Sequence, residues 1–261
     1  MSKRTNTSTL TTRKAPFRGL GVKILKFIRN LFLIFLVVSV VWVILARFVP
    51  IYVTPLMAIR SVESIVRGEM PKNSKTWIPI EEISPNMVQA VVASEDNLFL
   101  QHYGFSFNDI GKAIQHNQNG KRIRGGSTIS QQTAKNVFLW QQRSYIRKGL
   151  EAYFTVLIEL IWNKERIMEV YLNVIEMGDG IYGIQAASLE HFGVNASQLS
   201  KSQAATIAAC LPNPIRFNAG HPSGYILRRR SQIVNLMGKL PRIDFDNPVV
   251  PVKHVRKHHK K

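Results

Sequence analysis

A long apolar stretch near the N-terminus constrains this chain more than any other feature. Leu31–Ala46 (LFLIFLVVSVVWVILA) carries no charge and one polar residue, Ser39. With the apolar residues that flank it, the stretch reaches the roughly 20 residues that a membrane-spanning helix needs. Arg47 and Pro50 follow it, and no small-residue cleavage pattern does. The sequence therefore predicts one retained transmembrane anchor over residues 31–50 rather than a removed signal peptide.

The excess of positive charge lies largely at the two ends of the chain. The formal net charge is +19; residues 1–30 hold eight Lys and Arg and no acid, and Lys253–Lys261 hold five more. The positive-inside rule makes 1–30 a basic cytoplasmic tail and puts everything after the anchor outside the cytoplasmic membrane. We interpret 246–261 as a basic C-terminal tail. Such tails set topology and contact anionic lipid, so we expect no nucleic-acid partner.

Residues 51–245 are predicted to form one mainly α-helical domain that begins with a stalk. Apolar residues recur at three- and four-residue steps, and no stretch alternates at period two for long. In the stalk, Ile51–Trp77, prolines leave room for a short helix over Ser61–Gly68. A helix is expected from Ile83, with Ser84-Pro85 as its start signal. Further helices are expected over Asn108–His116, Ser130–Leu139, Arg147–Trp162, Lys164–Asn173, Ile184–Phe192, Gln203–Leu211 and Ile226–Leu240.

The sequence offers no set of residues typical of a metal site. Cys210 is the only cysteine, which excludes an intramolecular disulfide and a multi-cysteine zinc site. It lies in an apolar run, AATIAACL, so we interpret it as a small buried residue. His102 has neither an HExxH partner nor a nearby Ser and Asp, which favours a structural role. We therefore predict no metal-ligating residues.

Glu95 is the first candidate for chemistry. It lies at the end of the helical pattern MVQAVVASED, where the negative end of the helix dipole favours a protonated carboxyl. This raises the pKa of the side chain toward the range that is useful for proton transfer. The alternative is a surface acid pair, Glu95 and Asp96, without a catalytic role.

A polar stretch, Gly125–Asn136 (GGSTISQQTAKN), is the second candidate. Its glycines let the backbone approach a ligand closely, and Ser127, Thr128, Gln131 and Gln132 can bond to sugar hydroxyls. Lys135, together with Arg143 beyond the stretch, could hold a pyrophosphate. The alternative is a glycine turn with an N-cap at Thr128 or Ser130 that opens a helix.

Arg147, Lys148 and Glu151 begin the next helix. An intrahelical ion pair between Arg147 and Glu151 is the simplest interpretation of this spacing. Two carboxylates on separate helices, Glu95 and Glu151, also resemble the acid pair of a glycosidase.

Taken in order, these motifs resemble glycosyltransferase family 51, the peptidoglycan polymerases, and within it the stand-alone biosynthetic peptidoglycan transglycosylases. The resemblance covers roughly residues 65–240. Its motifs are Glu95–Gly104 (EDNLFLQHYG, for EDxxFxxHxG), Gly125–Asn136 (for GGSTITQQLAKN, with Ser130 and Thr133 as departures), Arg147–Glu151 (RKGLE, for RKxxE), Lys164–Asn173 (KERIMEVYLN) and the runs GDGIYGIQAAS and LPNP.

The resemblance implies a lysozyme-like, mainly α-helical domain that polymerises lipid II at the outer face of a bacterial inner membrane, in the periplasm. By this resemblance, Glu95 is the base that deprotonates the acceptor 4-hydroxyl, and Glu151 is the second acidic position. The residues implied to bind substrate are Ser127, Gln132, Lys135, Arg143, Arg147 and Lys148. No cofactor is required, although a divalent cation, Mg²⁺ or Mn²⁺, could share the donor pyrophosphate. Lipid II, the growing glycan and the membrane are the implied partners, and cell-wall synthesis or division proteins are compatible with them.

Two other functions remain open from the sequence. A lytic enzyme could use two glutamates, but it would have little use for cations that clamp a diphosphate. A non-enzymatic membrane scaffold would not need an intact Glu95 and Glu151. No serine is followed three residues later by lysine, and KTG is absent, so we expect no penicillin-binding activity.

Overall fold

The structure is a computed structural model that describes residues 17–106 and 126–246. Side chains of the first helix are described from residue 21 onward. The helix expected over Asn108–His116, the first glycine of the polar stretch, Gly125, and most of both basic tails lie outside the described residues.

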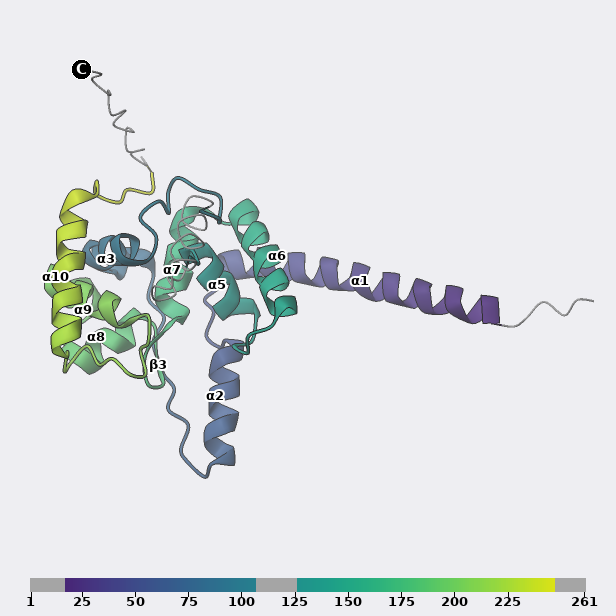
Figure 1. Cartoon of the computed structure of the whole chain (residues 1–261), viewed down its shortest axis with the longest axis horizontal. Coiled ribbons are helices and arrows are strands. Elements are labelled where there is room, and N and C mark those ends of the chain that lie inside the picture. The colour runs from purple at the N-terminus through teal and green to yellow at the C-terminus, as the bar shows by residue number, and fades with distance from the viewer. Residues whose placement is uncertain (1–16, 107–125, 247–261) are drawn as a thin grey trace, which may run out of the picture. The chain divides into compact units, whose positions relative to one another are not determined.

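The described chain is mainly α-helical, as the sequence predicts (Figure 1). Its α-helices are α1 (Phe17–Phe48), α2 (Pro55–Val66), α3 (Pro85–Glu95), α5 (Ile129–Phe138), α6 (Tyr145–Ile161), α7 (Lys164–Val174), α8 (Ile184–Phe192), α9 (Lys201–Cys210) and α10 (Gly224–Lys239). Its short elements are the 3₁₀ helices η1 (Ile80–Glu82) and η2 (Ala196–Gln198) and the strands β1 (Ser74–Lys75), β2 (Glu176–Gly178) and β3 (Ile181–Tyr182).

Most helices begin at a polar cap that lies within three residues of the predicted start of the helix. A side-chain oxygen accepts a backbone N–H of the first turn at Ser84, Thr128, Ser144, Asn163, Ser200 and Ser223. Such caps satisfy donors that have no partner inside the helix. Of the two caps considered for α5, Thr128 is therefore the correct one, and Ser130 lies inside the helix.

The short helix expected over Ser61–Gly68 begins earlier than predicted. α2 begins at Pro55, because Thr54 caps it and proline at the first helical position needs no N–H partner. Pro55 therefore starts this helix and does not break the segment.

A small three-stranded sheet was missed from the sequence. Its strand order is β1-β3-β2, with β1 parallel and β2 antiparallel to β3. Each strand has only two or three residues, which is too short for an alternating pattern to be visible.

The chain divides into two compact units, Met1–Trp42 and Val43–Lys261. In the first unit, apolar side chains of α1 such as Leu31, Ile34 and Val37 are more than half exposed. A helix that is apolar on all sides is stable in lipid rather than in water. Among the described residues, Gly21–Phe48 is the stretch long and apolar enough to cross a membrane.

The second unit has one main hydrophobic core built by helices. α9 packs against both α3 and α10, and α5 packs against α6 and α7. Cys210, at the end of α9, is 1% exposed, and burial raises the pKa of its thiol to about 11. The prediction of a small buried cysteine is confirmed, and a thiol with this pKa is a poor nucleophile at neutral pH.

Asn173, near the end of α7, joins this helix to the segment before α3. Its Oδ1 accepts the Ile78 N–H at 3.0 Å, and its Nδ2 donates to the carbonyls of Ile78 at 2.8 Å and Glu169 at 2.9 Å. The side chain is completely buried. Gly183 packs so closely that an added Cβ would lie 2.7 Å from the Asn173 carbonyl oxygen.

We expect Asn173→Ala to destabilise the second unit by about 3 kcal/mol, because it leaves the buried N–H and C=O of Ile78 without partners. Chemical denaturation of the detergent-solubilised chain measures this change. Asn97→Ala, at an exposed asparagine, is the matched control. Equal stability of the two variants would contradict this account of α7.

Candidate active site

The site is built where α3 ends and α5 begins. Glu95 is the last residue of α3, and Asp96 is its C-cap. The Asp96 carboxylate is buried and accepts the backbone N–H of Ile129, the first residue of α5, at 3.1 Å. A carboxylate at this position also complements the positive end of the α5 dipole. Asp96 therefore fixes the start of α5 beside the end of α3.

His102 supports Asp96 from the other side. Its Nε2–H donates to the two Asp96 carboxylate oxygens at 2.9 and 3.0 Å. Two residues further on, Gly104 has φ +81° and lies so close to α6 that an added Cβ would meet Thr155 Cγ2 at 2.6 Å. The structural role predicted for His102 agrees with these contacts, although the prediction assumed that no aspartate lies nearby and the structure places Asp96 against its ring.

A capping box holds the first turn of α5. The Gln131 N–H donates to Thr128 Oγ1 at 3.2 Å, and the Thr128 N–H donates to Gln131 Oε1 at 3.0 Å. Thr128 Oγ1 in turn donates to the carbonyl of Gly104 at 2.7 Å. The N-cap considered as an alternative for the polar stretch is therefore real, and it fixes the helix that carries Gln132 and Lys135.

Gln132 connects α5 to Glu95. Its Nε2 donates to Glu95 Oε2 at 2.9 Å, and its Oε1 lies 3.4 Å from the hydroxyl of Tyr171. Tyr171, on α7, is completely buried. A phenol that donates to Oε1 orients the amide so that its N–H groups face the carboxylate.

The environment of Glu95 favours its protonated form. Burial raises the pKa of Glu95 above its usual value of 4.5; the Gln132 hydrogen bond and the charge of Arg229 oppose this rise, and Asp96 adds to it. The upward direction expected from the helix end is confirmed, although the leading cause is burial. A raised carboxyl pKa suits a group that accepts a proton during a reaction.

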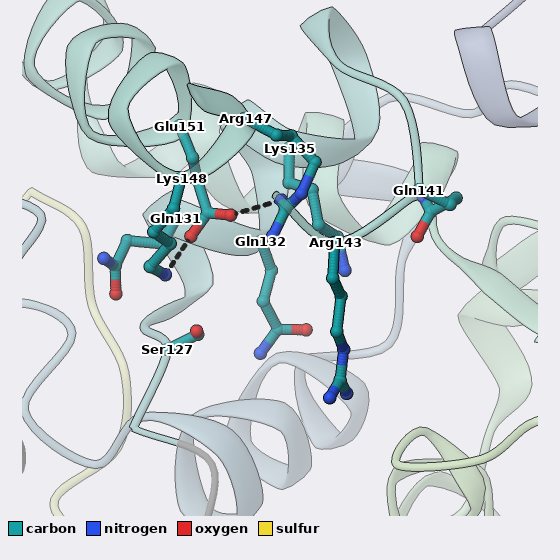
Figure 2. Close-up of a pocket in the computed structure, with 9 residues that line it drawn as sticks. All are labelled: Ser127, Gln131, Gln132, Lys135, Gln141, Arg143, Arg147, Lys148 and Glu151. Atoms are coloured by element: carbon teal, nitrogen blue, oxygen red, sulfur yellow. Dashed lines mark hydrogen bonds and ion pairs between the residues drawn. The ribbon is translucent and has the colours of Figure 1, made fainter. Parts of the chain in front are cut away.

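Beside this junction lies a pocket of about 350 Å³ between α5 and α6 (Figure 2). It is lined by Ser127, Gln131, Gln132, Lys135, Gln141, Arg143, Arg147, Lys148 and Glu151. Four of these side chains are cationic and one is a carboxylate. A polar pocket with this balance is suited to an anionic ligand.

The carboxylate belongs to Glu151, which is 3% exposed. Its Oε2 accepts from Arg147 Nη1 at 2.7 Å, and its Oε1 accepts from Lys148 Nζ (Figure 2). The intrahelical ion pair predicted for Arg147 and Glu151 is therefore present. The same carboxylate holds both cations at the wall of the pocket.

Lys135 lies among like charges. Burial lowers the pKa of Lys135; Glu151 opposes this effect, and Arg147, Lys148 and Arg143 add to it. Within the described ranges, neither Lys135 nor Arg143 forms an ion pair with a carboxylate. An anion bound here would relieve the repulsion among these cations.

The structure brings the predicted site residues together. Ser127, Gln132, Lys135, Arg143, Arg147, Lys148 and Glu151 all line the pocket. Glu95 is not among the lining residues, but its hydrogen bond to Gln132 joins it to them. Sequence reasoning missed Gln141 and Tyr171. Gln141 lies in a short connection without a helical pattern, and Tyr171 lies inside the expected helix Lys164–Asn173, where no local pattern singles it out.

The pocket does not fit a resident divalent cation. Such ions need several oxygen ligands, and both oxygens of Glu151, the carboxylate of the pocket, already accept from cationic side chains. In the part of the chain that the structure describes, no group of three or more His, Cys, Asp or Glu side chains is placed to hold a metal.

The helical fold thus carries a cationic pocket, suited to an anionic ligand, beside the Glu95 carboxylate. The sequence profile of the family described as Transglycosylase matches residues 62–238, which is more than half of the chain. The chain belongs to this family, and it is a glycosyltransferase.

Several biosynthetic peptidoglycan transglycosylases are similar over most of their length. The protein of Bacteroides thetaiotaomicron is 54% identical over 240 residues, covering 92% of this chain and 97% of its own. That of Bdellovibrio bacteriovorus is 54% identical over 210 residues, covering 80% and 84%. That of Caulobacter vibrioides is 49% identical over 227 residues, covering 85% and 96%.

We expect Glu95→Gln to increase the free energy of unfolding at neutral pH. Because the pKa of Glu95 is higher in the folded than in the unfolded chain, the wild-type protein loses stability as pH rises between the two values. The loss is about 1.4 kcal/mol for each unit of that difference. The variant, which cannot titrate at this position, avoids it.

Denaturation at a series of pH values measures this difference. Below the unfolded value near 4.5, wild type and variant should have the same pH dependence, because the carboxyl is protonated in both states. If the free energies of unfolding of wild type and variant differ by the same amount from acid to neutral pH, the pKa of Glu95 is not raised.

Proposed function

We propose that this chain polymerises lipid II into the glycan strands of peptidoglycan, with inversion at the donor sugar. The 4-hydroxyl of the acceptor GlcNAc loses its proton to Glu95, and its oxygen bonds to C1 of the donor sugar. The bond from C1 to the diphosphate breaks, and undecaprenyl diphosphate leaves with both bonding electrons. The observation that carries this proposal is the partly buried carboxylate of Glu95, which a hydrogen bond joins to a pocket with four cations.

The base in this proposal is Glu95. Its burial raises its affinity for a proton, and the Gln132 amide holds one carboxylate oxygen at 2.9 Å. The other oxygen is then oriented for the acceptor hydroxyl. A positioned base of this kind accounts for a rate factor of roughly 100 to 10,000.

Lys135 and Arg143 bind the donor diphosphate in this proposal, together with Arg147 and Lys148. Lysine supplies a point charge, and arginine supplies a fork that matches phosphate oxygens. As the bond to C1 breaks, charge grows on the diphosphate, so cations at this place stabilise the transition state more than the ground state. Ser127 and Gln132 offer hydrogen bonds beside them.

Glu151 acts on the donor side through its neighbours. Because both of its oxygens accept from Arg147 and Lys148, it positions these cations and is poorly placed to take a proton. We therefore assign it a positioning role rather than the role of a second acid. No step requires a metal; a divalent cation, if present, would arrive bound to the diphosphate.

The proposed location is the bacterial inner membrane. The N-terminal apolar helix is consistent with a single-pass anchor. By the positive-inside rule the basic N-terminus is cytoplasmic and the catalytic domain is periplasmic. A lipid-linked substrate in the outer leaflet and an enzyme tethered to the same leaflet meet at a raised effective concentration. Contacts with cell-wall synthesis or division proteins are compatible with this location.

We expect Glu95→Gln to lower the rate of polymerisation roughly 1000-fold, because the amide cannot accept the proton. Detergent-solubilised full-length protein is incubated with labelled lipid II, and the products are separated on a gel before and after muramidase digestion. Glu69→Gln, at an exposed glutamate, is the matched control. A folded Glu95→Gln variant with a near-normal rate would remove Glu95 from the mechanism. Breakdown of preformed glycan by the wild-type protein, without polymer, would indicate a lytic enzyme.

We expect Lys135→Ala to lower the rate with lipid II roughly 100-fold, because it removes a cation from the leaving diphosphate. Glu151→Asp should cost less, since aspartate can still pair with one of the two cations. Lys201→Ala, at an exposed lysine of α9, controls for the loss of a positive charge. Equal and modest effects at positions 135 and 151 would contradict the diphosphate assignment.

A further inference from the structure

Two of the family motifs contribute nothing to the catalytic pocket. The run GDGIYG forms the hairpin of β2 and β3, and LPNP follows α9. Neither motif supplies a residue that lines the pocket between α5 and α6. Both supply residues to a second hollow, which we call the hairpin groove.

The hairpin groove has a volume of about 570 Å³, within the range of pockets that bind small ligands. It lies between four segments: residues 72–74, the hairpin residues 178–181, the end of α8 at Glu190 and His191, and the loop 214–221. It shares no lining residue with the catalytic pocket. Figure 1 shows α8 and β3 on the side of the second unit away from α6.

The hairpin groove and the catalytic pocket differ in the charge of their lining side chains. In the hairpin groove, Lys72 forms an ion pair with Asp179 at 2.7 Å, and the other formally charged side chain of its lining is Glu190. The chain as a whole has a net charge of +19, yet no excess of cations faces this groove. A diphosphate or an anionic lipid headgroup would therefore gain little electrostatic attraction here. An uncharged polar ligand would meet no electrostatic repulsion.

The lining combines apolar and hydrogen-bonding surface. Ile181, Ile215 and Phe217 offer apolar contact, and Phe217 packs on Tyr225 with ring centroids 5.6 Å apart. Asn218 and His221 offer planar polar groups. Asn218 Oδ1 accepts the N–H groups of Gly220 at 2.8 Å and His221 at 3.0 Å, which fixes the orientation of its amide.

Two glycines of the β2–β3 hairpin let it pack closely against its neighbours. Gly180 has φ +73°, and a Cβ there would lie 2.4 Å from Lys72 Cβ. Gly178 is also crowded, since an added Cβ would meet Ile181 Cδ1 at 2.7 Å. Gly180 thus lets the hairpin pack against Lys72, and Gly178 lets it pack against the Ile181 side chain. The groove is therefore preformed, which lowers the entropy cost of binding.

Sugar rings present apolar C–H faces and rims of hydroxyl and amide groups, and such a lining complements both. We propose that the hairpin groove binds a segment of the uncharged β-1,4-linked sugar backbone, which is the product in the proposed function on which this inference rests. A strand held at the groove would stay bound to the same protein molecule between additions. By the logic of effective concentration, such retention lengthens the product without changing the chemistry of each step.

The direct test is binding of β-1,4-linked N-acetylglucosamine tetramer, a probe with neither diphosphate nor peptide. Titration calorimetry on the detergent-solubilised full-length chain gives its affinity without any turnover. The groove variant is Glu190→Ala combined with Ile215→Ala, because both side chains are exposed and lie on different walls. The matched control is Glu82→Ala combined with Leu236→Ala, two exposed positions outside both hollows.

We expect the wild type, the control and Lys135→Ala to bind the tetramer alike, and the groove variant to bind it at least about fivefold more weakly. Equal affinity of the groove variant and the wild type, or no binding by any of them, would overturn the proposal. Loss of binding in Lys135→Ala alone would place the tetramer in the catalytic pocket and would overturn it too.

Polymerisation gives a second, independent measurement. We expect the groove variant to start lipid II polymerisation within about twofold of the wild-type rate but to release shorter strands. Unchanged strand length would contradict the proposed retention. If the wild type binds the tetramer at the groove but makes no polymer, the proposed function fails while the binding site stands.

Discussion

The buried carboxylate of Asp96 is the constraint on which the site depends. It accepts the first backbone N–H of α5 and the Nε2–H of His102, so it ties the end of α3 to the start of α5. Since Glu95 precedes Asp96 directly, and Gln132 lies one turn into α5, this single carboxylate determines that the two side chains meet. Lys135 follows on the next turn of α5 and faces the cations of α6.

Without a ligand, the ionised forms of Glu95 and Lys135 are destabilised by the site that surrounds them. Glu95 is desolvated, so its ionised form is disfavoured, and Lys135 is desolvated beside three other cations. Both conditions lower the stability of the folded chain, and both suit a reaction in which a proton moves to the carboxylate and an anion leaves toward the cations. The stability lost at the site is offset by the apolar core, in which α9, for example, buries every residue from Ala204 to Cys210.

The helices could be predicted from the sequence because their signals are local. Apolar steps mark each helix, and the Ser, Thr and Asn caps set its start; α8, which has no side-chain cap, was predicted with correct bounds. The strands could not be predicted, because two or three residues carry no pattern and their pairing joins Ser74 to Ile181. The chemistry of the polar stretch indicated Ser127, Gln132, Lys135 and Arg143, and the family resemblance added substrate binding by Arg147 and Lys148. The contact of Tyr171 with Gln132 and the groove at the β2–β3 hairpin depend on tertiary packing, which periodicity does not reveal.

Burial makes Glu95 a stronger base than an ordinary glutamate, and a direct titration tests this. Carbon-13 NMR of the glutamate side-chain carboxyls in the detergent-solubilised chain follows each group with pH, and the Glu95→Gln variant identifies the signal. We expect a titration midpoint for Glu95 above the usual 4.5. A midpoint at or below 4.5 would contradict it.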